Sequence, residues 1–281
     1  MRIDEITIRD PFVLPDRKSG RYWLFGTTDS SHSRPENPTH GFDCYSSTDL
    51  VEWTGPVRAF SPAPDFWGKY NFWAPEVHII GGRYFMSATF KADGVCRGTQ
   101  LLVSDVPQGP YRPHGAGAQT PRDWECLDGT LHIDRSGTPW MVFCHEWLQI
   151  GDGTICAVRL SDDLTTAAGE PVMLFHASDA PWTRELRPGC RVTDGPFLFA
   201  GDDGALSMLW SSFGEHGYAM GIARSENGVT GPWHQQREPF FGRDGGHGMI
   251  FRTFDGKRHL VLHSPNVTPL ERAVFLPFPE K

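Results

Sequence analysis

The sequence predicts an all-β chain that folds as a five-bladed β-propeller with four-stranded antiparallel blades. Three observations lead to this prediction. Aromatic residues make up 12% of the 281 residues, and 31 glycines and 23 prolines are spread along the chain, which is typical of many short strands joined by tight turns. No apolar period of about 3.6 residues persists over a useful length. Finally, one strand–turn–strand pattern recurs along the whole sequence.

This recurring pattern defines the blades. Each copy opens with a small or acidic residue and continues into an apolar strand, a glycine-containing turn and a second apolar strand; a third strand leads to a segment that resembles Ser-X-Asp. The openings follow one another at about 50 to 65 residues, the length of a four-stranded blade with its loops. We expect a single domain over residues 1–281, in which residues 1–8 add a strand to the last blade and close the ring. The five copies cover residues 9–53, 74–111, 127–164, 193–233 and 246–278.

The strand order places ionisable residues around one mouth of the ring. The first strand of a blade lies nearest the axis and the second runs antiparallel to it, so the start of the first and the end of the second share one face. Clustered carboxylates raise some of their pKa values, which lets an acid and a base coexist near neutral pH. The alternative is that each aspartate only caps its strand. The strand openings are Asp10, Glu76, Asp128, Asp194 and His247. The ends of the second strands are Asp29, Lys91, His145, Glu146, Ser212 and His263.

Aromatic residues accompany these positions. Flat aromatic faces pack against the C–H faces of sugars and leave the ring hydroxyls to polar groups. Packing between blades is the alternative, and we expect it for Trp53, Trp140 and Trp210. The aromatic residues near the openings or their connecting loops are Phe12, Phe66, Trp67, Phe72, Trp73 and Trp147.

Composition excludes several classes of partner. The net charge is -8 and no Lys/Arg-rich stripe is present, which argues against a nucleic-acid partner. No apolar run approaches the roughly 18 residues of a membrane span, so we expect no membrane partner. A basic start followed by an apolar stretch is missing from the first residues, which favours a cytoplasmic location. The six cysteines form no Cys-X-X-Cys pair and are expected to be buried free thiols. The sequence does not fix an oligomeric state.

The chain resembles glycoside hydrolase family 43 over nearly its whole length. The resemblance implies a five-bladed propeller, exo- or endo-hydrolysis of saccharides that contain arabinose or xylose, and inversion at the anomeric carbon. The motifs that carry it follow the order and spacing of the repeats. They are RDPF at 9–12, FWAPEV at 72–77, LDGTL at 127–131, DGPFLF at 194–199 and GGHGMIF at 245–251.

The resemblance also implies the roles of three carboxylates. Asp10 corresponds to the general base that activates water, and Asp128 to the residue that orients the acid and tunes its pKa. The family's general acid is normally a glutamate before Gly-Pro, where this chain has Asp194. The shorter side chain sets the carboxyl about 1.5 Å further back, and a misplacement of about 1 Å can cost roughly a hundredfold in rate. Either the substrate sits deeper and Asp194 reaches it, or Glu146 is the acid. A structural salt bridge is the alternative for Glu146.

His247 lies in a glycine-rich turn. The resemblance implies that a histidine here helps to hold a calcium or sodium ion in the central channel. A hydrogen bond to substrate and a purely structural role are equal alternatives, since calcium prefers oxygen ligands. No cofactor is expected to be required. The residues expected to bind substrate are Phe12, Trp73, Glu76, His145, Trp147 and His247.

The leading hypothesis is an inverting glycosidase that acts on small saccharides. Two carboxyls would flank the scissile bond at about 6.5–9.5 Å and leave room for water. We expect exo-action on arabinofuranosyl or xylosyl linkages of short oligosaccharides, since a cytoplasmic enzyme meets only imported pieces. The alternatives are a sugar-binding propeller with impaired catalysis, which the Asp194 departure favours, and a retaining fructosidase-like propeller.

Overall fold

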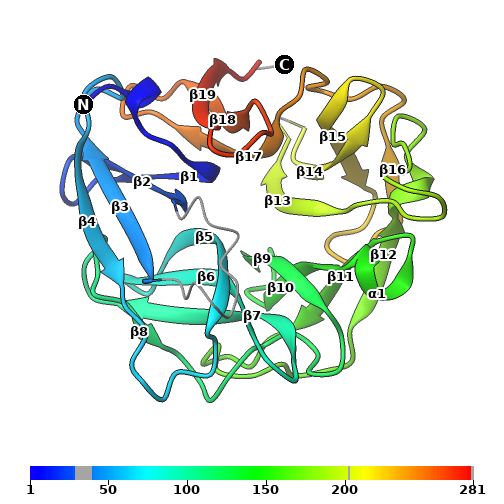
Figure 1. Cartoon of the computed structure of the whole chain (residues 1–281), viewed down its shortest axis with the longest axis horizontal. Coiled ribbons are helices and arrows are strands. Elements are labelled where there is room, and N and C mark those ends of the chain that lie inside the picture. The colour runs from blue at the N-terminus through cyan, green and yellow to red at the C-terminus, as the bar shows by residue number, and fades with distance from the viewer. Residues whose placement is uncertain (29–39, 202, 280–281) are drawn as a thin grey trace.

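The computed structural model describes residues 1–28, 40–201 and 203–279. Within these residues, five antiparallel sheets stand around a central axis, and the chain visits them in sequence order (Figure 1). The first strand of each sheet lies nearest the axis, as the pattern predicted. The five-bladed propeller is therefore confirmed. Of the residues expected at the mouth, Asp29 lies outside the described part of the chain.

Nineteen strands and three short helical turns make up the described structure. Blade one contains β1 (Arg9–Asp16), β2 (Arg21–Thr27), β3 (Phe42–Ser47) and β4 (Thr54–Phe60). Blade two contains β5 (Tyr70–Ile80), β6 (Arg83–Ala92), β7 (Val95–Ser104) and β8 (Arg112–Pro113). Blade three contains β9 (Cys126–Ile133), β10 (Pro139–His145), β11 (Thr154–Arg159) and β12 (Val172–His176). Blade four contains β13 (Asp194–Ala200), β14 (Leu206–Gly214), β15 (Gly217–Ser225) and β16 (Trp233–Gln235). Blade five contains β17 (Gly246–Arg252), β18 (Arg258–Ser264) and β19 (Arg272–Pro277). The helical turns are η1 (Ile3–Glu5), α1 (Trp147–Ile150) and η2 (Ala177–Asp179).

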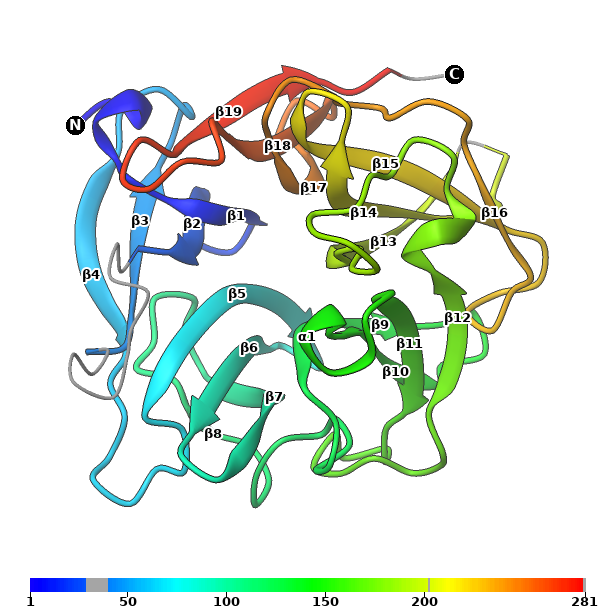
Figure 2. The same ribbon diagram turned by 45° about the vertical axis from the view of Figure 1, so that its right-hand side comes forward.

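The N-terminal segment closes the ring against blade five. Thr7 forms an antiparallel bridge with Arg272, and the amide of Ile8 donates to the carbonyl of Glu271 at 3.3 Å. Ile6 and Ile8 are buried. Figures 1 and 2 both show this segment beside β19. Residues 1–8 therefore join the last blade as expected, although by a single bridge and not by a full fourth strand.

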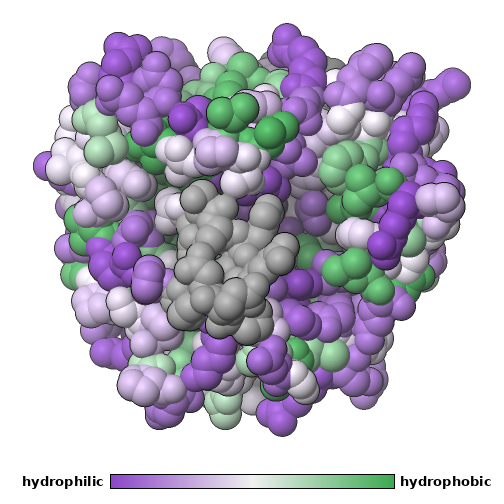
Figure 3. Space-filling model, viewed as in Figure 1, coloured by the Kyte–Doolittle hydropathy of each residue, from purple (hydrophilic) through white to green (hydrophobic). Residues whose placement is uncertain are grey.

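The core lies between neighbouring blades. Trp53 and Trp210 are buried there as expected, and Trp140 is partly buried with its indole N–H on Asp134 at 2.9 Å. All six cysteines are free thiols, and four of them are buried. No helix in the described part of the chain is long and apolar enough to cross a membrane. Hydrophilic residues dominate the face seen in Figure 3, where hydrophobic residues form only small separate groups.

The inner strand of every blade begins with the same irregularity, a β-bulge. Over three residues of the inner strand, the second strand advances by only two, as between Arg9 and Phe12 against Thr27 and Phe25. One residue inside each bulge has a left-handed backbone, with φ between 47° and 54°. For a residue other than glycine this costs about 1–2 kcal/mol. The left-handed residues that align across the five blades are Asp10, Ala74, Asp128, Gly195 and His247. Blade two has an additional bulge between Tyr70 and Trp73, in which Asn71 is left-handed with φ 51°.

The position of the bulge shows that the expected alignment of the five blade openings was wrong. Asp10, Asp128 and His247 occupy the left-handed position, but Asp194 stands one residue before it, and Glu76 stands two residues after it. The expected openings therefore mixed three structural positions. Proline or glycine follows each of the five aligned left-handed residues, which suits a place where the strand ladder is interrupted.

Candidate active site

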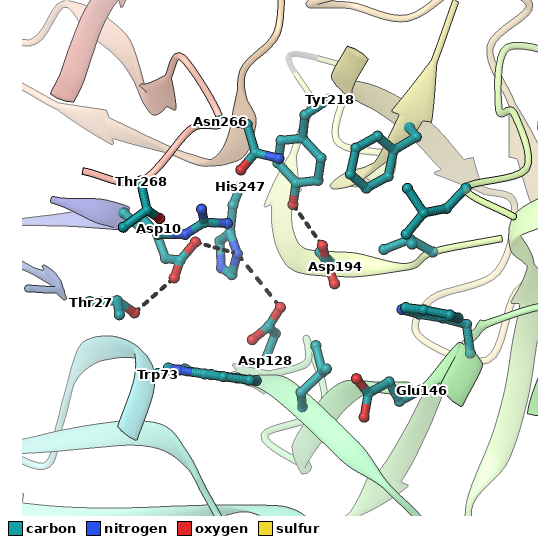
Figure 4. A pocket seen from close by; sticks show the side chains of 16 residues that line it. Asp10, Thr27, Trp73, Asp128, Glu146, Asp194, Tyr218, His247, Asn266 and Thr268 are labelled. Atoms are coloured by element: carbon teal, nitrogen blue, oxygen red, sulfur yellow. Dashed lines mark hydrogen bonds and ion pairs between the residues drawn. The ribbon is translucent and has the colours of Figure 1, made fainter. Parts of the chain in front are cut away.

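All five blades contribute side chains to one pocket of about 380 Å³. Asp10, Trp73, Asp128, Asp194 and His247 line it, one from each inner strand. Figure 4 shows these side chains converging from separate blades. The pocket is of a size that suits a small ligand, with a few convergent polar groups in it.

Asp10 is held as a carboxylate. Its Oδ2 accepts from the hydroxyl of Thr27 at 2.8 Å, and its Oδ1 lies 3.1 Å from Nδ1 of His247. Burial works to raise the pKa of Asp10, but the charge and hydrogen bond of His247, together with Arg9, hold it well below its usual range. Its backbone N–H donates to Nδ1 of His263 at 3.2 Å. Burial lowers the pKa of His263 to about 4, so this nitrogen is free to accept.

Asp128 and Asp194 have the opposite shift. Burial raises the pKa of Asp128 to about 6, helped by the charge of Asp10, although its Oδ2 accepts from the amide of Gly195 at 3.1 Å. Burial, followed by the charge of Asp128, raises the pKa of Asp194 to about 7. The hydroxyl of Tyr218 donates to Oδ2 of Asp194 at 2.9 Å and opposes part of this rise. One pocket therefore holds an ionised carboxylate and a carboxyl that is largely protonated below pH 7.

His247 is the cation between these groups. Its Nδ1 lies 3.1 Å from Asp10 and 3.6 Å from Asp128. Burial works to lower the pKa of His247, but the two carboxylates raise it to about 10. The described residues contain no group of three or more His, Cys, Asp or Glu placed to hold a metal ion. The ion in the central channel stays a prediction.

Glu146 enters the pocket from the turn between β10 and α1. Its carbonyl accepts from the amide of Gln149 at 3.0 Å, and its side chain is buried. One carboxylate oxygen forms an ion pair with the guanidinium of Arg97. Burial raises the pKa of Glu146 to about 7, although the charge of Arg97 opposes that rise. Because arginine keeps its proton, this contact favours the charged carboxylate.

The profile of Glycosyl hydrolases family 43 matches residues 3–277. The chain belongs to this family. It is therefore a glycosidase that hydrolyses glycosidic bonds.

Relatives and solved structures agree with this assignment. An extracellular exo-α-(1→5)-L-arabinofuranosidase from Cellvibrio japonicus is 28% identical, over 92% of this chain and 79% of its own. An extracellular endo-α-(1→5)-L-arabinanase from Bacillus subtilis is 23% identical, over 50% of this chain and 44% of its own. The crystal structure of an endo-arabinase from Bacteroides thetaiotaomicron superposes with a TM-score of 0.92 at 42% identity, covering 100% of this chain and 97% of that one. The cytoplasmic location stays a prediction.

Three residues expected to bind substrate lie outside the family 43 pocket. Phe12 is buried in the core, below the bulge. Glu76 is buried too, with an oxygen 3.3 Å from Nε2 of His78. The ring of His145 stacks on Trp124 with centroids 4.3 Å apart. The first two stand two residues after the left-handed position, and this offset carries them away from the mouth.

Of the residues at or just after the ends of the second strands, some line the pocket and others do not. Trp147 lines the pocket, and the guanidinium of Arg187 lies 4.6 Å from its ring centroid. Lys91 instead forms an ion pair with Glu125 at 2.6 Å, and Ser212 is buried away from the pocket lining. Of this set, only Glu146 reaches the pocket as a charged group.

Several pocket residues were missed from the sequence. Arg9, Trp73, Leu127 and Asp194 all stand one residue before the left-handed position, so the aligned motifs would have placed Arg9 and Leu127 there. Tyr218 comes from a third strand, and no local pattern marks it. The missed pocket residues are Arg9, Thr27, Leu127, Leu186, Val192, Phe213, Tyr218, Asn266 and Thr268.

Proposed function

We propose that the protein is an inverting, exo-acting glycosidase that releases arabinofuranosyl or xylosyl residues from short oligosaccharides. Two relatives named for α-(1→5)-L-arabinan linkages favour the arabinofuranosyl unit. The observation that carries the proposal is the opposite pKa shift of Asp10 and Asp194 within one pocket. Such a split is what an acid and a base need in order to act together near neutral pH.

The proposed reaction divides two proton transfers between these residues. Asp10 takes a proton from the attacking water, whose oxygen bonds to the anomeric carbon from the face opposite the leaving group. Asp194 gives its proton to the glycosidic oxygen as that bond breaks. Asp128 raises the pKa of Asp194 by its charge and so keeps the acid protonated until it is used. Inversion follows from a single displacement.

Burial raises the pKa of both candidate acids to about 7, so it is their neighbours that favour Asp194. Asp194 is surrounded by carboxylates, which favour its protonated form. Glu146 contacts the guanidinium of Arg97, which favours its ionised form. Tyr218 fixes one oxygen of Asp194 and leaves the other for the substrate.

A wall of the pocket supports exo-action. The guanidinium of Arg9 donates to Oε1 of Glu271 at 2.8 Å, and the hydroxyl of Thr268 donates to the same oxygen at 2.6 Å. Arg9, Asn266 and Thr268 all line the pocket, and Figure 4 shows Asn266 and Thr268 on the side of Asp10. We infer that this segment of blade five closes the pocket at one end and so leaves room there for a single terminal sugar unit.

Asp10→Asn tests the catalytic proposal. Asparagine keeps the size and tolerates the left-handed backbone, but it cannot take a proton from water. We expect at least a roughly hundredfold loss of turnover on an arabinofuranosyl oligosaccharide, with an unchanged circular dichroism spectrum. A variant that keeps most of its activity would show that Asp10 is a turn residue.

The wild-type products test inversion and exo-action. Proton NMR should show the inverted anomer of a monosaccharide first. Initial retention would point to a fructosidase-like double displacement, and early release of oligomers would point to endo-action. Absence of turnover on arabinosides, xylosides and galactosides would favour a sugar-binding propeller.

A further inference from the structure

A buried arginine lies behind the floor of the pocket. Arg97, from β7, is 6% exposed and does not line the pocket itself. Its guanidinium forms the ion pair with Glu146 and lies 4.7 Å from the ring centroid of Trp73. Its second terminal nitrogen donates to Oδ1 of Asn71 at 3.2 Å. One guanidinium therefore contacts the two neighbouring side chains, Glu146 and Trp73, that do line the pocket.

A further carboxylate stabilises this arginine from behind. The backbone N–H of Arg97 donates to Oε2 of Glu125 at 2.9 Å, and the guanidinium lies 3.8 Å from the same oxygen. Lys91 holds the other oxygen of Glu125 at 2.6 Å. Burying such charges gives little net stability compared with apolar residues of similar size. The arrangement therefore calls for a role in binding.

Only one of the two carboxylate oxygens of Glu146 has a hydrogen-bond partner among the described residues. Its Oε2 is bound by Arg97, and within the described residues no group donates a hydrogen bond to its Oε1. Figure 4 shows the carboxylate directed into the pocket, on the same side as Asp194. An ionised carboxylate only accepts hydrogen bonds, and a sugar hydroxyl is a matching donor.

We propose that Glu146 accepts a hydrogen bond from a hydroxyl of the leaving-group sugar, and that Arg97 is the positioning residue that holds the Glu146 carboxylate in place. The inference rests on the proposed function, because Asp194 marks the side on which the leaving group lies. The stacked ring of Trp73 offers its free face to the same substrate. The Arg97–Glu146 pair therefore makes the enzyme prefer a saccharide as the leaving group over an aglycone that has no hydroxyl.

Glu146→Gln is the direct test. The amide keeps the shape but weakens the acceptor and its hold on Arg97. A hydrogen bond to a charged group contributes enough that its loss should lower kcat/KM for an arabinofuranosyl disaccharide roughly 10- to 100-fold, mainly through KM. Nitrophenyl arabinofuranoside, whose leaving group has no hydroxyl to bind, should change less than threefold. The acidic and basic limbs of the pH profile of kcat/KM should stay at the same pH values as in the wild type.

Two further variants separate binding from structure. Asp105→Asn removes an exposed carboxylate just beyond the other end of β7, where it pairs with Arg83 and Arg112 away from the pocket, so both substrates should be affected less than threefold. Arg97→Met with Glu146→Gln avoids an unpaired buried charge. It should reproduce the disaccharide defect while keeping the melting temperature close to that of Glu146→Gln alone.

Two outcomes would overturn the inference. Equal losses on both substrates, or none, would show that Glu146 is structural. A loss in kcat that grows with the pKa of the phenol across a series of aryl glycosides, with a lost basic limb, would make Glu146 the acid. Failure of the proposed function is distinguishable, because it would show in Asp10→Asn or Asp194→Ala while the disaccharide-specific effect of Glu146→Gln could still be measured.

Discussion

At the scale of single residues, His247 explains how three carboxyl groups share one pocket. Its imidazolium lies within 3.6 Å of both Asp10 and Asp128. It is the largest influence that lowers the pKa of Asp10, whereas at Asp194 burial and the charge of Asp128 outweigh it. The ring packs on Gly195, where an added Cβ would meet it at 2.6 Å. A cation placed asymmetrically among carboxylates thus produces both a base and an acid.

Tyr218→Phe should raise the pKa of the acid, Asp194, while leaving its carboxyl group in the pocket. In the wild type, kcat/KM is expected to fall as the pH rises above about 7, because Asp194 then loses the proton that it must donate. Tyr218 favours the ionised form of Asp194, so its removal raises that pKa and should move the basic limb upward by about one pH unit. Turnover of a natural disaccharide should fall roughly tenfold, since the acid is no longer oriented. A basic limb that stays at the same pH would show that Tyr218 does not influence the pKa of the acid.

At the scale of elements, the bulge at the start of each inner strand builds the site. It recurs in all five blades, and in each the aligned left-handed residue or its predecessor lines the pocket, with both doing so in blades one and three. The sequence contains this signal, because proline or glycine follows each of the five aligned left-handed residues. Glu76 and Asp194 were misaligned because carboxylates, and not the backbone punctuation, were used to set the register.

The third strands show what local patterns miss. Arg97 in β7 and Tyr218 in β15 reach the site across the sheet, from strands that contribute nothing else to the mouth. Their positions depend on blade twist and on packing between blades, which a single strand's sequence does not encode. The blade count and the inner-strand carboxylates could be predicted, whereas this supporting layer could not.

Gly195→Ala tests the bulge against a matched glycine. Gly195 has φ +52° and packs on the His247 ring, whereas Gly20 has φ +67° and open space around it. Both substitutions place a side chain in the left-handed region, at a cost of about 1–2 kcal/mol. Only Gly195→Ala must also displace His247, so it should lose activity as well as stability. Equal stability and activity of the two variants would contradict the role given to the bulge.

At the scale of the whole molecule, the propeller depends on closure of the ring. Ile6 and Ile8 are buried beside blade five, and Thr7 bridges Arg272. The next residue pair, Arg9 and Asp10, already lines the pocket. The same short segment therefore joins the first blade to the last and delivers the base to the site.

Ile6→Ala should weaken this closure. Truncation of a buried isoleucine costs about 2–5 kcal/mol, so the free energy of unfolding measured in urea should fall by that amount. Val51→Ala is the control, since Val51 is 49% exposed and its loss should stay within about 0.5 kcal/mol. Activity of folded Ile6→Ala at low temperature should be kept, because no pocket contact is lost. Equal stability of the two variants would show that the N-terminal segment does not hold the ring.

The pairing of Asp10 as base with Asp194 as acid is tested most directly by Asp194→Ala on aryl arabinofuranosides of graded phenol pKa. An activated phenol leaves without a proton, whereas a poor leaving group needs one. The loss of rate should therefore be small for a dinitrophenyl glycoside, grow steadily with the phenol pKa and be largest for a natural disaccharide. Equal slowing of all substrates by Asp194→Ala, with the graded dependence found in Glu146→Ala instead, would contradict the assignment.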